Sequence, residues 1–190
     1  VDWLMDWKDN TNFKLNLEEI KGTWTKLADR EELAKKYPNA VDTKSVLDVT
    51  FATERDASLV DFIDSTTGKV LSRHKAGFAV HVTVTNKKNP RYAYSISRSG
   101  RLTMFDIAAP GQPAIASVQV GFESRGLAVS PDGKYVIAGN YTPGGAVLCD
   151  AMTLEPLKAY DTSAVINTEG QIEASRVASL ADTPYGPYFA

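Results

Sequence analysis

Hydrophobic and polar residues alternate in short runs from about residue 46 onward, and turn residues separate the runs. Alternation at period two between such turns is typical of β-strands. The pattern predicts strands at residues 47–52, 58–64, 70–73, 79–85, 92–97, 102–107, 116–120, 126–130, 135–139, 146–150, 157–161 and 176–181. The spacing of these strands favours an all-β fold.

The first 45 residues have a helical pattern instead. Asn16 is a good N-cap, and Glu19 stands three positions later, as in a capping box. An apolar stripe at helical spacing follows the cap, at Leu17, Ile20, Trp24 and Leu27. A second helical segment is expected at residues 29–36, before Pro38. We interpret residues 1–45 as a helical arm or linker, packed onto another surface by its tryptophans, Trp3, Trp7 and Trp24.

A repeat is visible in the strand-rich part of the chain. Asp64, Asp106 and Asp150 each follow one apolar strand and precede another, and they lie 42 and 44 residues apart. This spacing is close to the ~40–45 residues of a four-stranded propeller blade. The segment Ser130 to Tyr135 is a turn that propellers often place between the inner strands of a blade. Residues 46–190 are therefore predicted to form a partial β-propeller, preceded by the helical arm.

The number of blades is too small for a closed ring. The strand-rich region holds about three to four blades, and a propeller closes with roughly four to eight. An open arc would leave unpaired strand edges. We therefore expect this chain to be a segment, completed either by a missing remainder or by a second polypeptide.

His81 is the first candidate for chemistry. In the segment Gly77 to Thr83, strict alternation would place His81 on one strand face with the small residues Ala79 and Thr83. We expect a buried imidazole with room above it for a flat ligand. A neutral imidazole is a natural iron ligand, although a strand histidine can also simply form a hydrogen bond within the propeller. The other histidine, His74, is interpreted as a surface residue.

Several motifs, in order along nearly the whole chain, resemble the start of the heme d1 propeller of cytochrome cd1 nitrite reductases and of related proteins of d1 biogenesis. The motifs are the His81 segment and residues 18–24, 55–57, 97–104, 123–125, 138–141 and 154–156. The resemblance implies an eight-bladed propeller, of which this chain would be the N-terminal part. It also implies that His81 is the proximal axial ligand of the heme d1 iron.

The resemblance further implies four cofactor-binding side chains, from Arg55, Arg98, Arg125 and Tyr141. Heme d1 carries several carboxylates, and a guanidinium can bind a carboxylate through two parallel hydrogen bonds. Arg55 precedes His81 by 26 residues, which is the spacing expected from the family. The alternative for each arginine is a surface salt bridge, and for the tyrosine a packing role at the rim.

The chain departs from the family pattern at two positions and ends before a third feature. Val84 stands where the reductases have a further cofactor-facing arginine, and Gly126 stands where the family tends to have serine. The resemblance implies that the pair of distal histidines that protonate nitrite lies beyond Ala190. No catalytic residue is therefore expected in this chain.

The function implied by the resemblance is that of the heme d1-binding part of a periplasmic nitrite reductase, which forms nitric oxide from nitrite in denitrification. A d1-biogenesis or delivery protein is the first alternative, and a cofactor-free propeller scaffold is the second. The scaffold alternative predicts that His81 is buried against protein atoms and that the three arginines do not converge.

The resemblance also implies partners. The remaining blades would complete the propeller, a c-type heme would lie on a preceding domain, and a c-type cytochrome or cupredoxin would donate electrons. We expect a homodimer or a larger assembly.

Composition narrows the classes of function. The net charge of −2 gives no general attraction to nucleic acid, and 43% hydrophobic residues are sufficient for a globular core. The single cysteine, Cys149, excludes an internal disulfide and a C-x-x-C-H heme attachment motif, and we expect it to be buried and inert. No apolar run approaches the ~20 residues that span a bilayer, and the first residues lack the pattern of a signal peptide.

Overall fold

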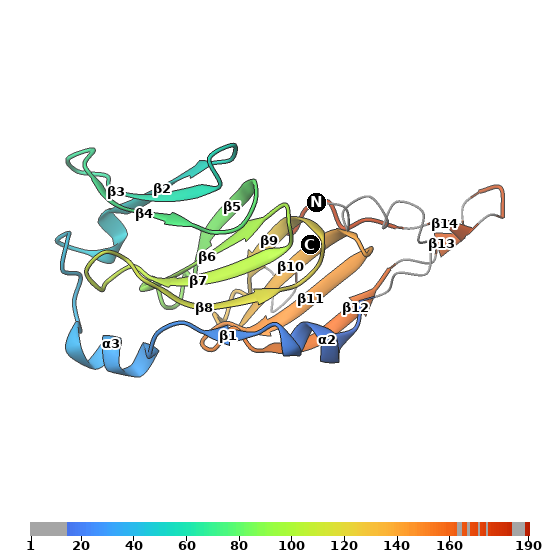
Figure 1. The fold of residues 1–190 in the computed structure, drawn as a ribbon, viewed down its shortest axis with the longest axis horizontal. Helices are drawn as coiled ribbons and strands as arrows, with labels where there is room; N and C mark the ends of the chain where they lie inside the picture. The colour runs from blue at the N-terminus through green and yellow to red at the C-terminus, as the bar shows by residue number, and fades with distance from the viewer. Residues whose placement is uncertain (1–14, 163–164, 167, 171, 174, 184–188) are drawn as a thin grey trace.

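The computed structural model describes residues 15–162, 165–166, 168–170, 172–173, 175–183 and 189–190. Three antiparallel sheets lie side by side in an arc (Figure 1). The first sheet contains β2 (Val49–Glu54), β3 (Leu59–Asp64) and β4 (Val70–Lys75). The predicted partial propeller, made of antiparallel strands with a short helical arm before them, is confirmed.

The second and third sheets each contain a complete four-stranded blade. The second contains β5 (Val80–Thr85), β6 (Tyr92–Ser97), β7 (Arg101–Asp106) and β8 (Ala114–Gln119). The third contains β9 (Glu123–Val129), β10 (Tyr135–Thr142), β11 (Gly145–Asp150) and β12 (Pro156–Asp161). A separate two-stranded hairpin follows, formed by β13 (Val165–Ile166) and β14 (Ile172–Glu173).

The three repeated aspartates occupy equivalent turns. Asp64, Asp106 and Asp150 end β3, β7 and β11, and each carboxylate accepts a backbone N–H from the residue two positions later, at 2.9, 3.1 and 2.7 Å. This equivalence aligns β3 with β7 and β11. Within the described residues, the first sheet therefore has no counterpart of the innermost strands β5 and β9.

The N-terminal arm contains α2 (Leu17–Gly22), the short strand β1 (Thr25–Lys26) and α3 (Arg30–Lys36), and a 3₁₀ turn (Val46–Asp48) precedes β2. The predicted cap at Asn16 is confirmed, because its side chain accepts backbone N–H groups at the start of α2. Asp29 caps α3 in the same way. The predicted helical stripe from Leu17 to Leu27 is longer than the helix. The helix ends at Gly22, since residues 25–26 pair with β8 as a fifth strand, and Leu27 is 52% exposed.

The arm is held against the outer rim of the second and third sheets. Trp24 packs against the core between them and donates its Nε1–H to the Thr153 carbonyl at 3.0 Å, as the packing prediction expected. Trp3 and Trp7 lie outside the described residues. The division of the chain at residue 45 stays a prediction.

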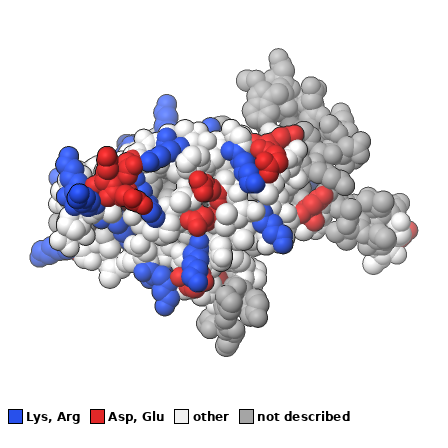
Figure 2. All heavy atoms as spheres, turned by 90° about the horizontal axis from the view of Figure 1, so that it is seen from below, with Lys and Arg blue, Asp and Glu red and all other residues white. Residues whose placement is uncertain are grey.

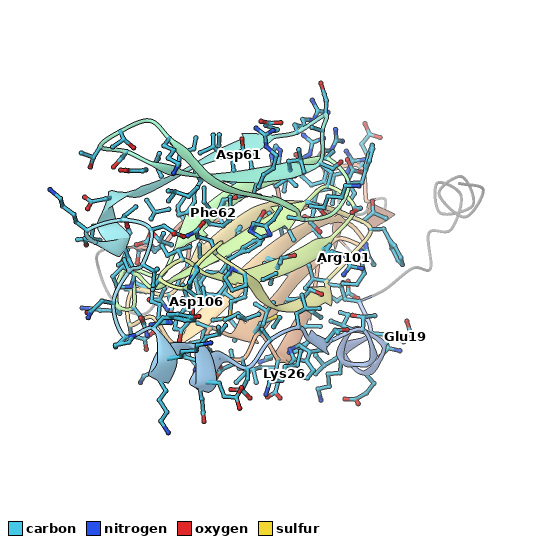
Figure 3. The ribbon with its side chains drawn as sticks, turned by 60° about the vertical axis from the view of Figure 1, so that its left-hand side comes forward. Glu19, Lys26, Asp61, Phe62, Arg101 and Asp106 are labelled. Atoms are coloured by element: carbon cyan, nitrogen blue, oxygen red, sulfur yellow. The ribbon has the colours of Figure 1, made fainter. Side chains whose placement is uncertain are left out.

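The core lies between the sheets rather than at one centre. Figure 3 shows Phe62 between the first and second sheets, with Glu19 and Lys26 on the arm. Cys149 is buried in the core between the second and third sheets, as predicted, and its burial raises the pKa of its thiol.

On the face that carries the arm, Figure 2 shows acidic and basic side chains interspersed. No basic stripe for a polyanion is visible on this face. In the part of the chain that is described, no helix is both long and apolar enough to cross a membrane.

One predicted strand is absent. Residues 175–181 lie against the third sheet but do not form a strand, although residues 176–181 were predicted to form one. The segment forms individual backbone hydrogen bonds to the end of β10 and to Thr162 rather than a ladder.

Candidate functional site

The side chain of His81 is exposed, so the prediction of a buried imidazole was wrong. Val80 pairs with Ser97 and Val82 pairs with Ile96, which leaves His81 as the extra residue of a β-bulge. Ala79, just before the strand, has a φ of 51° and breaks the alternation further. A bulge re-aims a side chain, and here it turns His81 outward.

The environment of His81 is electropositive. Burial of part of the ring is the largest cause that lowers its pKa, followed by the positive charges of Arg125, Arg98 and Arg55. Both effects disfavour the imidazolium form. The positive charges of the three predicted arginines therefore act on His81, and they favour the neutral imidazole that can bind a metal.

Arg98 and Arg125 are joined through one carboxylate. Glu123 Oε1 lies 2.7 Å from Arg98 Nη2 and 3.4 Å from Arg125 Nη2, and all three side chains are partly buried. The backbone N–H of Ser124 donates to the Arg98 carbonyl at 3.1 Å. This bond joins the start of β9 to the turn after β6, so the two arginines meet where the second and third sheets adjoin.

Tyr141 lies beside Arg125. The Arg125 guanidinium carbon is 4.4 Å from the centre of the Tyr141 ring, and that of Arg176 is 5.5 Å from it. Arg125 Nε is buried and has no hydrogen-bond partner within the described residues. Arg176 was missed by the sequence reasoning, because no motif marked it.

Arg55 contributes from the first sheet. It is exposed in the turn after β2 and forms no ion pair with any residue that the structure describes. Its charge still acts on His81. Arg55 is therefore the most weakly held member of the group.

The departures at Val84 and Gly126 have local explanations. Val84 packs against the large core between the second and third sheets. At Gly126, an added Cβ would lie 3.2 Å from Leu180 Cδ1. The absent side chain thus makes room for the segment that crosses the third sheet.

The other histidine is not a simple surface residue. His74 Nε2 lies 2.8 Å from the Gly111 carbonyl oxygen, and the His74 ring packs against Phe62 and Phe105. Its role is to join the first and second sheets, so it is not part of the site.

The residues present fit an iron macrocycle with carboxylate side chains. Among the described residues, no group of three or more histidine, cysteine or acidic side chains is arranged to hold a metal ion. His81 therefore offers a single imidazole, which suits an iron already held by a macrocycle. The buried, unpartnered Nε of Arg125 fits a site that lacks an anionic acceptor.

The fold is that of part of a β-propeller, and the family follows from comparison. Residues 44–190 match the family model described as the cytochrome D1 heme domain, so the chain belongs to that family.

Individual relatives support the same family. The chain is 30% identical over 162 residues to a nitrite reductase of Stutzerimonas stutzeri, a match that covers 83% of this chain and 27% of the relative. It is 31% identical over 125 residues to a dihydro-heme d1 dehydrogenase of Pseudomonas aeruginosa, covering 66% and 24%. The chain thus spans about a quarter of the length of these relatives.

Solved structures agree with the fold. The dihydro-heme d1 dehydrogenase NirN, solved in complex with DHE, matches with a TM-score of 0.77 and 26% identity, over 92% of this chain and 35% of that chain. A Cps50 (Swd1) β-propeller domain from Myceliophteria_thermophila matches with a TM-score of 0.55 and 13% identity, over 80% of this chain and 48% of that one. The second match supports the propeller fold alone.

Proposed function

We propose that this chain is the first part of the heme d1 propeller of a cytochrome cd1-type nitrite reductase. The observation that carries the proposal is an exposed His81 whose pKa is lowered by burial of part of its ring and by the positive charges of Arg125, Arg98 and Arg55. The match to a nitrite reductase over 83% of the chain supports it. The scaffold alternative expects a buried His81, and the exposure of the His81 side chain disfavours it.

In this proposal, His81 would hold the heme d1 iron through its imidazole, and Arg55, Arg98 and Arg125 would bind the carboxylates of heme d1. Tyr141 packs at the edge of the site against Arg125. When bound, heme d1 supplies the iron chemistry that reduces nitrite to nitric oxide. The residues of this chain position the cofactor and balance its charge, while residues outside the chain supply the distal acids.

The proposal includes partners and a compartment. The first sheet lacks a counterpart of β5 and β9 among the described residues, which supports completion of the propeller by further blades. A heme c on a preceding domain would pass electrons to heme d1, with a c-type cytochrome or cupredoxin as donor. We place the protein in the periplasm, as a homodimer or larger assembly.

A d1-biogenesis or delivery protein is the second candidate. The observation that favours it is the TM-score of 0.77 to a dihydro-heme d1 dehydrogenase over 92% of this chain. Both candidates would use His81 and the three arginines to bind heme d1. They differ in whether a heme c domain is present beside the propeller.

The test is an optical spectrum of the whole purified protein, oxidised and dithionite-reduced, repeated on His81→Ala, with mass analysis of every polypeptide. Long-wavelength d1 bands that weaken in the variant, together with a c-type signal, support the reductase. Bands of d1 without heme c support biogenesis. A protein that stays colourless where d1 is made would overturn both.

A further inference from the structure

The side chain of Arg176 is exposed, but the backbone on both sides of it is hydrogen-bonded. The Val177 N–H donates to the Asn140 carbonyl at 3.0 Å, and the Ser175 N–H donates to the Thr162 carbonyl at 3.2 Å. Thr162 Oγ1 donates back to the Ser175 carbonyl at 3.3 Å. The residues on both sides of Arg176 are therefore tied to the third sheet.

Two glycines allow this segment to lie close to the sheet. A Cβ added at Gly139 would lie 2.6 Å from Val177 Cγ1, a distance that real Cβ atoms do not show, and one at Gly126 would lie 3.2 Å from Leu180 Cδ1. Glycine in a strand often marks a close approach of another backbone. The approach is what brings Arg176 to the end of β10, beside Tyr141.

Two guanidinium groups thus share one aromatic ring. Arg125 and Arg176 lie 4.4 and 5.5 Å from the centre of the Tyr141 ring. The two positive charges repel each other, and an anion between or beside them offsets the cost of this repulsion. Arg125 has Glu123 as a counter-ion, whereas Arg176 has no carboxylate partner within the described residues.

The charge of the whole group is unbalanced. Among the described residues, Arg98 and Arg125 share one carboxylate, that of Glu123, while Arg55 and Arg176 form no ion pair. A planar ligand with several carboxylates balances such a group better than a heme with two propionates. Arginine is suited to this task because its N–H groups form a rigid fork.

We propose that Arg176 is a further carboxylate-binding residue, which extends the site beyond the three arginines around His81. This inference rests on the proposed heme d1 site. The segment at residues 175–181 delivers the guanidinium across the third sheet, and the Tyr141 ring orients it together with Arg125.

The test is an optical titration of the whole protein, freed of cofactor, with heme d1 and separately with iron protoporphyrin IX. Arg176→Gln is expected to weaken binding of heme d1 by about tenfold, the effect of one charge-assisted contact. Arg176→Lys, which keeps the charge, is expected to restore part of the affinity. Arg30→Gln on α3, the same chemical change at the outer rim, is the matched control and should bind normally.

The two hemes separate a lost contact from a folding defect. A lost carboxylate contact weakens heme d1 more than iron protoporphyrin IX, whereas misfolding weakens both equally. Equal weakening, or normal d1 binding by Arg176→Gln, would overturn the role of Arg176 and leave the proposed function standing. Failure of the unmodified protein to bind heme d1 would overturn the proposed function and this inference together.

Discussion

The second sheet packs against a neighbour on each side, and the two interfaces differ in composition. Toward the third sheet it presents fully buried apolar side chains, among them Ile96, Leu102 and Met104, and the arm covers the rim of this interface. Toward the first sheet, a smaller apolar cluster centres on Phe62 and Phe105, whose rings meet edge to face at 5.2 Å.

A row of hydroxyl groups accompanies the smaller interface. The residues directly opposite one another across the second sheet are Thr83, Ser95, Thr103, Ser117 and Thr25. Ser95 on β6 and Thr103 on β7 lie two residues from Ala93 and Phe105, so they share the face of the sheet that packs against the first sheet. This interface therefore buries less apolar surface than the other.

The site follows this difference. Arg98, Glu123, Arg125 and Tyr141 come from the second and third sheets, where the packing is extensive, and only Arg55 comes from the first. Arg98 and Arg125 are therefore held in place before any cofactor binds, whereas the position of Arg55 depends on the smaller interface. We infer that the first sheet is the least stable part of the described chain.

The largest expected effect concerns this difference in stability. Phe62→Ala should lower the free energy of unfolding of the first sheet by about 4 kcal/mol, because a fully buried aromatic ring leaves a cavity. Hydrogen exchange should show faster exchange in β2–β4 and little change in β9–β12.

The matched control for that experiment is Leu102→Ala, in the other interface. It should cost about 3 kcal/mol and speed exchange in both the second and third sheets. If both variants speed exchange equally in all three sheets, the described part unfolds as one unit and the comparison fails.

The second prediction contrasts the arginines of the two regions. Arg125→Gln should weaken binding of heme d1 by about 2 kcal/mol, because its partly buried guanidinium is held by Glu123 and Tyr141. Arg55→Gln should weaken it only about twofold to fivefold, because the side chain is exposed and unpaired among the described residues. Optical titration of both variants tests this order, and a larger effect at Arg55 would contradict it.

A smaller effect is expected where the arm covers the larger interface. Trp24→Phe keeps an aromatic ring but removes the hydrogen bond to the Thr153 carbonyl, so it should cost about 0.5–1 kcal/mol. Urea unfolding measures this, with Trp24→Ala as the comparison that also removes the packing. A cost as large as that of Trp24→Ala would show that the hydrogen bond, rather than the ring, holds the arm.

The smallest effect depends on pH and lies in the first sheet. The hydrogen bond from Arg73 is the main cause that lowers the pKa of Asp61 below its usual 3.8. The carboxylate therefore stabilises the fold fully above pH 3.8 and loses this contribution as the pH falls through its lowered pKa. The stability difference between the protein and Asp61→Asn should shrink below pH 3.8 in urea unfolding. A difference that stays constant down to pH 2 would show that the charge of Asp61 contributes nothing.

Much of the fold was predictable because its signals are local. The turn at Asp106 is closed by a carboxylate that binds N–H groups two and three residues ahead, and the caps at Asn16 and Asp29 work over the same range. Eleven of the twelve predicted strands form, with ends shifted by a few residues. The sequence by itself also determined which residues are candidates for the site, with His81 at their centre.

Contacts between distant residues decided the rest. The bulge that exposes His81 arises from the pairing of β5 with β6, and the end of α2 arises from the pairing of β1 with β8. Arg176 reaches Tyr141 only because a segment far along the chain lies on two glycines of the third sheet. A periodic pattern records which side chains are apolar, but it does not record register, bulges or the approach of remote segments. Those features depend on how the sheets pack, and they place the side chains of the site.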